Sequence, residues 1–177
     1  PAKGKVKPAA TPYVTVMPGA GPRHFTFSPD GRFAYVVEEL TSTVAVFAQD
    51  AKTGFLAKHH DGVATLPADF KGQNTSADIH TDPSGKHLYQ SNRGHNALAI
   101  FSIGTSGHIA LQGHQDTMGK TPRNFLVDPK GEYVFVANQD TDNITIFRRD
   151  AKTGLLTYTG NSVSVPAPVC LKLLERK

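Results

Sequence analysis

The stretch PDGRFAYVVEELTSTVAVF (29–47) decides the fold, because two later segments repeat its pattern without a gap. These segments are PSGKHLYQSNRGHNALAIF (83–101) and PKGEYVFVANQDTDNITIF (129–147). Each one starts at a Pro-x-Gly turn, runs through apolar residues to a polar corner, and ends a second apolar run at phenylalanine. The starts at 29, 83 and 129 are separated by 54 and 46 residues. A repeat of this length indicates an architecture built from similar structural units.

Each repeat predicts four short β-strands. The first precedes the turn (24–27, 78–81 and 124–127), the second follows it, the third ends in the phenylalanine, and the fourth follows a glycine turn, as in 55–66. β-Branched and aromatic residues fill these runs, with Gly, Pro, Asn and Asp between them. Four strands per repeat are typical of a β-propeller blade. The alternative is a generic β-sandwich, but sandwiches do not repeat in sequence at this period.

The repeats predict an all-β chain that forms a partial β-propeller of about three blades. The opening PAKGKV resembles DAKTGFL (50–56), so we expect residues 1–18 to form the outer strand of a preceding blade. The blades are expected at 19–68, 69–118 and 119–177, the last with a closing strand. Propellers have four to eight blades, and three would leave apolar faces uncovered. We therefore expect missing N-terminal blades as partners, supplied by the same gene product or by a second chain.

Composition narrows the functional classes. The net charge of +4 and the pI near 9.2 come from scattered Lys and Arg, which favours a small anionic ligand and predicts no nucleic-acid binding. No apolar run approaches the ~20 residues that span a bilayer, so no membrane partner is predicted. The single Cys170, expected to be buried near the closing strand, predicts a reducing, cytoplasmic location. No metal or cofactor is predicted, because the outer-strand histidines share no ligand spacing: His59, His60, His108 and His114.

The blade pattern also predicts where the chemistry lies. The start of the first strand, the end of the second and the start of the third meet at one end of each blade, where the blades converge on a channel mouth. Polar residues occupy these positions in all three repeats, while the opposite ends carry ordinary solvated turns. The mouth residues are Arg23, His24, Glu38, Glu39, Asp78, His80, Asn92, Arg93, His95, Arg123, Asn124, Asn138 and Gln139.

Three long segments resemble the seven-bladed propeller lactonases. They are PGAGPRHFTFSPDGRFAYVVEELTSTVAVF (18–47), LPADFKGQNTSADIHTDPSGKHLYQSNRGHNALAIF (66–101) and GKTPRNFLVDPKGEYVFVANQDTDNITIF (119–147). The family includes bacterial 6-phosphogluconolactonase and fungal 3-carboxy-cis,cis-muconate lactonizing enzyme. The resemblance runs from about residue 3 to 173 and covers the C-terminal half of the family pattern. A family histidine on an upstream blade has no counterpart here.

The resemblance implies catalytic roles for Arg23, Glu39 and Arg93, which match the arginine of GPRHF, the glutamate of NEL and the arginine of SNRG. A lactonase needs a base to activate water and donors to stabilise the developing oxyanion. Glu39 suits the base or water-positioning role, and the arginines suit the oxyanion or anionic groups of the substrate. The alternative for Glu39 is a plain salt bridge to one of these arginines. Glu38, where the family has Asn, is expected to be structural.

The predicted substrate-binding residues complete the site. Arg123 matches the arginine of the family's TPRNF motif and is expected to hold a phosphate, and His80 matches the histidine of ADIH. His24, Asn124 and Gln139 join them from their places at the mouth. The implied substrate is a small anionic lactone, 6-phosphogluconolactone in the pentose phosphate pathway. A cyclase that makes or opens muconate lactones, and a non-catalytic binding propeller, are the alternatives.

Overall fold

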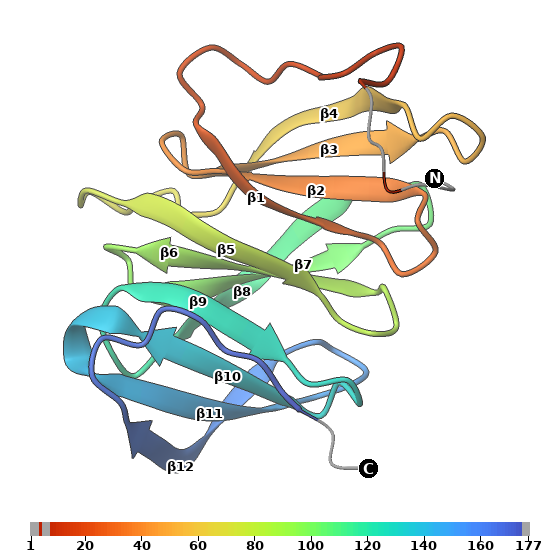
Figure 1. The fold of residues 1–177 in the computed structure, drawn as a ribbon. Helices are drawn as coiled ribbons and strands as arrows, with labels where there is room; N and C mark the ends of the chain where they lie inside the picture. Colours follow the sequence, from red (N-terminus) through yellow and green to blue (C-terminus); the bar gives the residue numbers. More distant parts are fainter. Residues whose placement is uncertain (1–3, 5–7, 175–177) are drawn as a thin grey trace.

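The computed structural model describes residue 4 and residues 8–174, and it contains three four-stranded antiparallel sheets (Figure 1). The first holds β1 (Pro22–Phe27), β2 (Phe33–Glu38), β3 (Thr43–Gln49) and β4 (Leu56–Ala64). The second holds β5 (Thr75–Thr81), β6 (His87–Arg93), β7 (Ala97–Ile103) and β8 (Ile109–Asp116). The third holds β9 (Pro122–Val127), β10 (Tyr133–Asn138), β11 (Asn143–Arg149) and β12 (Leu156–Ser164).

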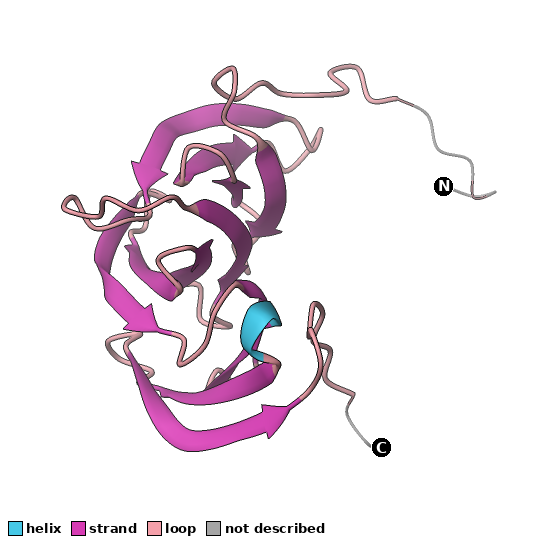
Figure 2. Ribbon diagram, turned by 90° about the vertical axis from the view of Figure 1, so that its left-hand side faces the viewer, coloured by secondary structure: helices cyan, strands magenta, loops and turns pink. Residues whose placement is uncertain are grey.

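Within each sheet the strands are ordered as in the sequence, which confirms the predicted propeller blades. We call the sheets the first, second and third blade. A single-turn helix η1 (Gln139–Thr141) connects β10 and β11, and Figure 2 shows it as the helical segment of the described residues. None of the described helical residues forms a segment long and apolar enough to cross a membrane.

The Pro-x-Gly turns form the hairpins between the first two strands of each blade. In the first blade the amide of Gly31 donates to the carbonyl of Ser28 at 2.8 Å, and the amide of Ser28 donates to the carbonyl of Phe33 at 2.8 Å. Gly31 has a φ of 70°, and the matching Gly85 and Gly131 both have a φ of 69°. This left-handed conformation strains any residue with a Cβ, so glycine recurs at the same place in each repeat.

Neighbouring blades pack through alternate residues of their strands. Tyr35 and Val37 of β2 point toward the second blade, where they meet Leu88 of β6 and Phe101 of β7. The other face of the second blade packs against the third in the same way, around the fully buried Phe147. Burial of one large apolar side chain contributes about 1.5–3 kcal/mol, so these two interfaces carry much of the stability.

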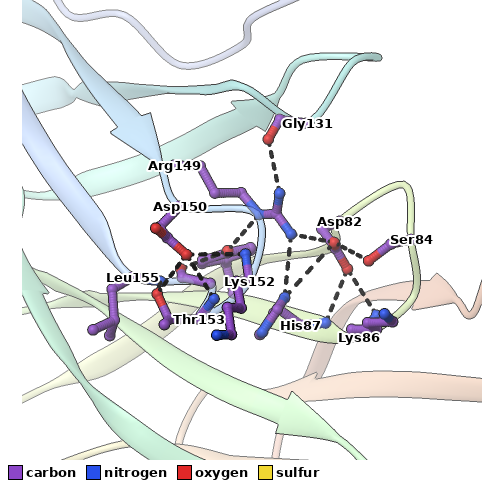
Figure 3. Close-up of polar contacts among 12 residues, drawn as sticks. Asp82, Ser84, Lys86, His87, Gly131, Arg149, Asp150, Lys152, Thr153 and Leu155 are labelled. Carbon is purple, nitrogen blue, oxygen red and sulfur yellow. Dashed lines mark hydrogen bonds and ion pairs between the residues drawn. The ribbon is translucent and has the colours of Figure 1, made fainter.

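A buried ion pair ties the second and third blades together at the end that carries the Pro-x-Gly turns (Figure 3). The guanidinium of Arg149 donates to the carboxylate of Asp82, and the two side chains are 3% and 0% exposed. Its remaining nitrogens donate to the carbonyl of Gly131 at 2.8 Å and to the hydroxyl of Tyr89 at 2.9 Å. The Tyr89 hydroxyl donates in turn to the carbonyl of Gly154 at 2.7 Å. Every polar atom of this cluster that Arg149 reaches is therefore satisfied.

The first and second blades have no such clamp. The repeat places Ile103 where Arg149 lies in the third blade and Tyr35 where Tyr89 lies in the second. The buried hydroxyl of Tyr35 consequently has no hydrogen-bond partner among the described residues. Burial raises the pKa of Tyr35 to about 12.

The described chain ends differ from the expectations in three respects. The outer strand expected within 1–18 does not form in the described part of that range, residue 4 and residues 8–18, because a strand needs a neighbouring strand for its backbone hydrogen bonds. Residues 165–174 likewise contain no closing strand. Cys170, expected to be buried, is exposed, because no further strand lies over this segment.

The segment after β12 nevertheless begins like an inner strand. Ala167 has a positive φ and precedes a proline, as Gly21 and Thr121 do where β1 and β9 begin. The amide of Leu171 then donates to the side-chain oxygen of Asn124 on β9 at 2.7 Å. Residues 167–171 therefore repeat the start of a blade and lie beside the innermost strand of the third blade.

Candidate active site

The innermost strands of the three blades, β1, β5 and β9, lie side by side, with β5 in contact with both others (Figure 1). Each begins at the same end of its blade, next to the end of the second strand. The register pairs Pro22 with Glu38 in the first blade, and Pro122 with Asn138 in the third. The mouth residues predicted from the repeats therefore gather at this end of the three blades.

Glu39 lies between two arginines from different blades. Its amide donates to the carbonyl of Gly21 at 2.8 Å, which fixes the residue after β2. Arg93, at the end of β6, donates to Oε1 of Glu39, and Nε of Arg23 on β1 lies 3.6 Å from Oε2. The side chains of Arg93, Arg23 and Glu39 are 13%, 18% and 30% exposed, so these charges interact in a partly desolvated place.

The arginines create a positive potential at the mouth. Burial lowers the pKa of Arg23, and the positive charges of Arg93 and Arg123 lower it further, while Glu39 and Asp78 partly offset the effect. Arg23 also donates to the carbonyl of Ala77 on β5 at 2.8 Å. Three guanidinium groups that influence one another in this way form a site suited to an anion, with which arginine pairs bidentately.

Asp78, on β5, is hydrogen-bonded to side chains of all three innermost strands. The sequence analysis predicted that it lies at the mouth but assigned it no role. Its Oδ1 lies 2.8 Å from Nδ1 of His24 on β1, and its Oδ2 lies 3.0 Å from Nε2 of His80 on β5. From β9, the side-chain amide of Asn124 donates to Oδ2 at 2.5 Å, and the amide of Phe125 donates to it at 3.2 Å. One carboxylate thus connects all three blades.

Asp78 stays ionised in this environment. Burial alone would raise the pKa of Asp78, whose side chain is 3% exposed. The hydrogen bonds from His80, His24 and the amide of Phe125, together with the charge on His80, outweigh burial and lower the pKa to about 2. A buried carboxylate with this many donors is stable as an anion.

The structure brings most of the predicted site residues into two linked groups. Arg23 belongs to both, because it faces Glu39 and its Nη1 lies 3.4 Å from Nε2 of His24. The first group adds Arg93, and the second is centred on Asp78. The members are Arg23, His24, Glu39, Asp78, His80, Arg93 and Asn124.

Two predicted residues are less closely tied to these groups. Arg123, on β9, influences the pKa of Arg23 but forms no hydrogen bond or ion pair with any described residue, so its guanidinium is available to a ligand. Gln139 begins η1 and has the same place relative to β10 that Glu39 has relative to β2. Its buried Oε1 has no partner within the described part of the chain.

Glu38 is structural, as expected. Adjacent strand residues point to opposite faces, so Glu38 and Glu39 separate at the end of β2. Glu38 is 4% exposed and accepts a hydrogen bond from the hydroxyl of Thr43 at 2.5 Å. The matching Asn92 and Asn138 are fully buried, and each is hydrogen-bonded both within its own blade and to a backbone carbonyl at the end of the preceding blade, that of Thr65 or Thr117.

A surface pocket of about 570 Å³ lies beside Arg93, and its other lining residues are Gln73, Asn74, Thr75, Gly94 and Thr121. A larger pocket of about 770 Å³ lies elsewhere, between residues 11–18 and the strands β3 and β4, and its lining is mainly apolar. The pocket at Arg93 adjoins the charged mouth, so we take it as the approach to the candidate site.

Three of the outer-strand histidines, which share no spacing in the sequence, are in contact in the structure. The ring of His108 lies 4.9 Å from the ring of His59 and 4.9 Å from that of His60, measured between centroids. Their spacing in the sequence gave no signal, because the contact joins two blades. Among residues 4 and 8–174 no group of histidine, cysteine or acidic side chains has the arrangement of a metal site.

Comparison with known proteins places these features in a family. The family model described as lactonase, 7-bladed beta-propeller, matches residues 2–173. A 6-phosphogluconolactonase of Bacillus subtilis is 37% identical over 160 residues, which are 90% of this chain and 46% of the relative. A 6-phosphogluconolactonase of Formosa agariphila is 46% identical over 149 residues, which are 81% of this chain and 40% of that relative.

A solved structure shows the same fold. The periplasmic gluconolactonase PpgL of Pseudomonas aeruginosa superimposes with a TM-score of 0.88 at 36% identity, over 97% of this chain and 47% of that one. The chain therefore spans about half the length of the relatives it matches. With the repeated blades, the residues at their mouth and the family match over 2–173, the chain belongs to the seven-bladed β-propeller lactonase family.

Proposed function

We propose that this chain is part of a lactone hydrolase whose substrate is 6-phosphogluconolactone, which it converts with water to 6-phosphogluconate. The observation that carries the proposal is the convergence of Arg23, Arg93 and Arg123 on one partly buried mouth. The substrate carries a phosphate, and its carbonyl oxygen becomes negative during attack, so one substrate has two anionic places for these groups. The names of the relatives from Bacillus and Formosa support this choice.

The site residues divide between binding and chemistry. Arg123, which has no ion-pair partner among the described residues, is suited to the phosphate. Arg93 and Arg23 are held in place by Glu39 and are suited to the carbonyl oxygen, where preorganised donors accelerate acyl transfer. We propose that three half-buried polar side chains at the mouth contact the sugar hydroxyls: His80, Asn124 and Gln139.

We also propose that further blades complete the site. The relatives are about twice as long as this chain. The first blade leaves Phe25 of β1 62% exposed, although the matching Ile79 and Phe125 are buried between blades. A neighbouring blade would cover that face, whether it comes from the same gene product or from a second chain. The cytoplasmic location stays a prediction, and the relative from Pseudomonas is named as periplasmic.

The proposal is tested by following acid release from 6-phosphogluconolactone and from unphosphorylated gluconolactone with the full-length gene product. We expect turnover well above spontaneous hydrolysis, and a higher kcat/KM for the phosphorylated lactone. Arg123→Met should remove most of this preference, while Lys130→Gln, at the opposite end of the blades, should keep it. Equal kcat/KM for both lactones would refute the phosphate assignment. Turnover of carboxymuconate in place of either lactone would identify a cyclase.

A further inference from the structure

We propose that a pocket between the first and second blades binds a small oxoanion, either inorganic phosphate or the phosphate group of a metabolite. The pocket has a volume of about 260 Å³ and is lined by residues of both blades, at the end that carries the Pro-x-Gly turns. This end is opposite to the mouth with the candidate active site. The inference therefore goes beyond the proposed lactone hydrolysis and does not depend on it.

The pocket occupies the place that the side chain of Arg149 fills at the other interface. There the guanidinium donates to the hydroxyl of Tyr89 and to the carbonyl of Gly131. The residues that match these three in the preceding repeat all line the pocket: Ile103, Tyr35 and Gly85. Isoleucine has neither the length nor the donors of arginine, so this interface keeps a pocket where the other has a clamp.

A buried hydroxyl without a partner belongs to the wall of this pocket. Tyr35 is fully buried, and its hydroxyl forms no hydrogen bond with any described residue. The matching hydroxyl of Tyr89 donates to Gly154, but the turn before the equivalent Gly107 is one residue shorter, and no such bond forms. Burial raises the pKa of Tyr35 to about 12, so the hydroxyl keeps its proton and can donate it to a ligand oxygen.

The lining residues offer a cation no free carboxylate. Asp82, which holds Arg149 at the other interface, is replaced in the first blade by Ser28. The acid of the first blade is Asp30, and Arg32 already occupies it through Nε at 2.7 Å and through its backbone amide at 3.1 Å. The hydroxyl of Ser28 also donates to Asp30. A cation in this pocket would therefore lack the partner that Arg149 has.

Lys86 supplies a positive charge that favours an anion. It lines the pocket from the second blade, and its ammonium group forms no hydrogen bond or ion pair with any described residue. The matching residue of the third blade is Glu132, so the repeat exchanges an acid for a base at this place. Since Arg32 and Asp30 balance each other, the charge of Lys86 is uncompensated. An oxoanion that accepts from Lys86 and Tyr35 would pair this charge and satisfy the buried hydroxyl.

The site is tested by backbone amide spectra of the full-length protein, titrated with inorganic phosphate in a phosphate-free starting buffer. We expect the amide signals of Gly85 and Gly104, which line the pocket, to move in a saturable way. Sodium chloride at equal ionic strength should leave them nearly unchanged. Phosphate at the mouth is read separately from the amide of Gly94. Without saturable shifts at Gly85 and Gly104 the proposal fails, whether or not the protein hydrolyses a lactone.

Two substitutions assign the anion to the named donors. Lys86→Gln should weaken phosphate binding at Gly85 by at least about tenfold, and Tyr35→Phe should also weaken it, because each removes a donor to a charged group. Lys130→Gln, at the exposed turn of the third blade, is the matched control and should keep the wild-type Kd. A wild-type Kd in folded Lys86→Gln would refute the site.

The same titration identifies the source of the oxoanion. If 6-phosphogluconate shifts the amides of Gly85 and Gly104 at lower concentration than inorganic phosphate does, the ligand is a phosphorylated metabolite. The reverse order identifies the free ion. Lys86→Gln should leave kcat for lactone hydrolysis unchanged, because Lys86 lies at the end of the blades opposite to the mouth.

Discussion

Arg93, from the second blade, donates a hydrogen bond to the carboxylate of Glu39, from the first blade. The two residues hold the same place in their repeats, at the end of the second strand: Glu39 directly follows β2, and Arg93 is the last residue of β6. The site is consequently shared between blades, since the first blade supplies Arg23 and Glu39 and the second supplies Arg93. Asp78 extends the same principle to the third blade through Asn124.

Glu39→Gln should weaken the orientation of both arginines without unfolding the protein. A hydrogen bond to a charged group contributes about 1.5–3 kcal/mol, so we expect kcat/KM for the phosphorylated lactone to fall about 10–100-fold. Steady-state kinetics measure this effect, and thermal unfolding should differ little from wild type because Glu39 is partly exposed. A fall of 10⁴-fold or more in kcat alone, beyond these ~10–100-fold limits, would mean that Glu39 itself takes the proton.

Arg149→Met should destabilise the interface between the second and third blades. It leaves the carboxylate of Asp82 buried without its guanidinium, and loss of one partner of a buried pair costs about 3–5 kcal/mol. Urea unfolding followed by circular dichroism measures the change. The exposed neighbour Arg148→Met is the control and should change the free energy of unfolding by less than about 0.5 kcal/mol. Equal stability of the two variants would contradict the clamp.

Two matched tyrosines should respond to the same substitution in opposite directions. Tyr89→Phe removes a hydroxyl that donates to Gly154 and accepts from Arg149, so we expect a loss of about 1–2 kcal/mol. Tyr35→Phe removes a buried hydroxyl that has no described partner, so we expect no loss or a gain of up to about 1 kcal/mol. Comparable destabilisation by both substitutions would show that the Tyr35 hydroxyl is satisfied.

Acid should destabilise the protein through Asp78. Its folded pKa of about 2 lies below the unfolded value near 3.8, so the folded state favours the ionised form. The contribution, about 2 kcal/mol, is fully present above pH ~4 and is lost as the pH falls from there through about 2. Urea unfolding at several pH values from 7 to 2 should show a steeper loss for wild type than for Asp78→Asn. Parallel curves would contradict the depressed pKa.

Much of the fold follows from local residue patterns. The Pro-x-Gly turns and the phenylalanines at 47, 101 and 147 predict the hairpins, because turn chemistry and apolar alternation act over a few residues. The same pattern predicted a strand within 1–18, and the described part of that range, residue 4 and residues 8–18, contains no strand and has no neighbouring strand to pair with. Strand formation depends on such partners as well as on the residues themselves.

The site was predictable only in part. Repeat positions placed Arg23, Glu39 and Arg93 at one mouth, since equivalent positions of a propeller converge. The role of Asp78 was not predictable, because it depends on which side chains of β1 and β9 reach one carboxylate across the interfaces. The contacts of His108 with His59 and the unpartnered hydroxyl of Tyr35 are likewise set by inter-blade packing, which leaves no spacing signal in the chain.

The central claim is that arginines from neighbouring blades bind an anionic lactone at this mouth and stabilise the negative charge that develops during its hydrolysis. The most direct test is kcat/KM for 6-phosphogluconolactone with the full-length Arg93→Met protein, compared with wild type and Lys130→Gln. The account predicts a fall of at least about 100-fold in Arg93→Met, as for loss of one oxyanion donor, and wild-type values for Lys130→Gln. A folded Arg93→Met protein with wild-type kcat/KM would contradict it.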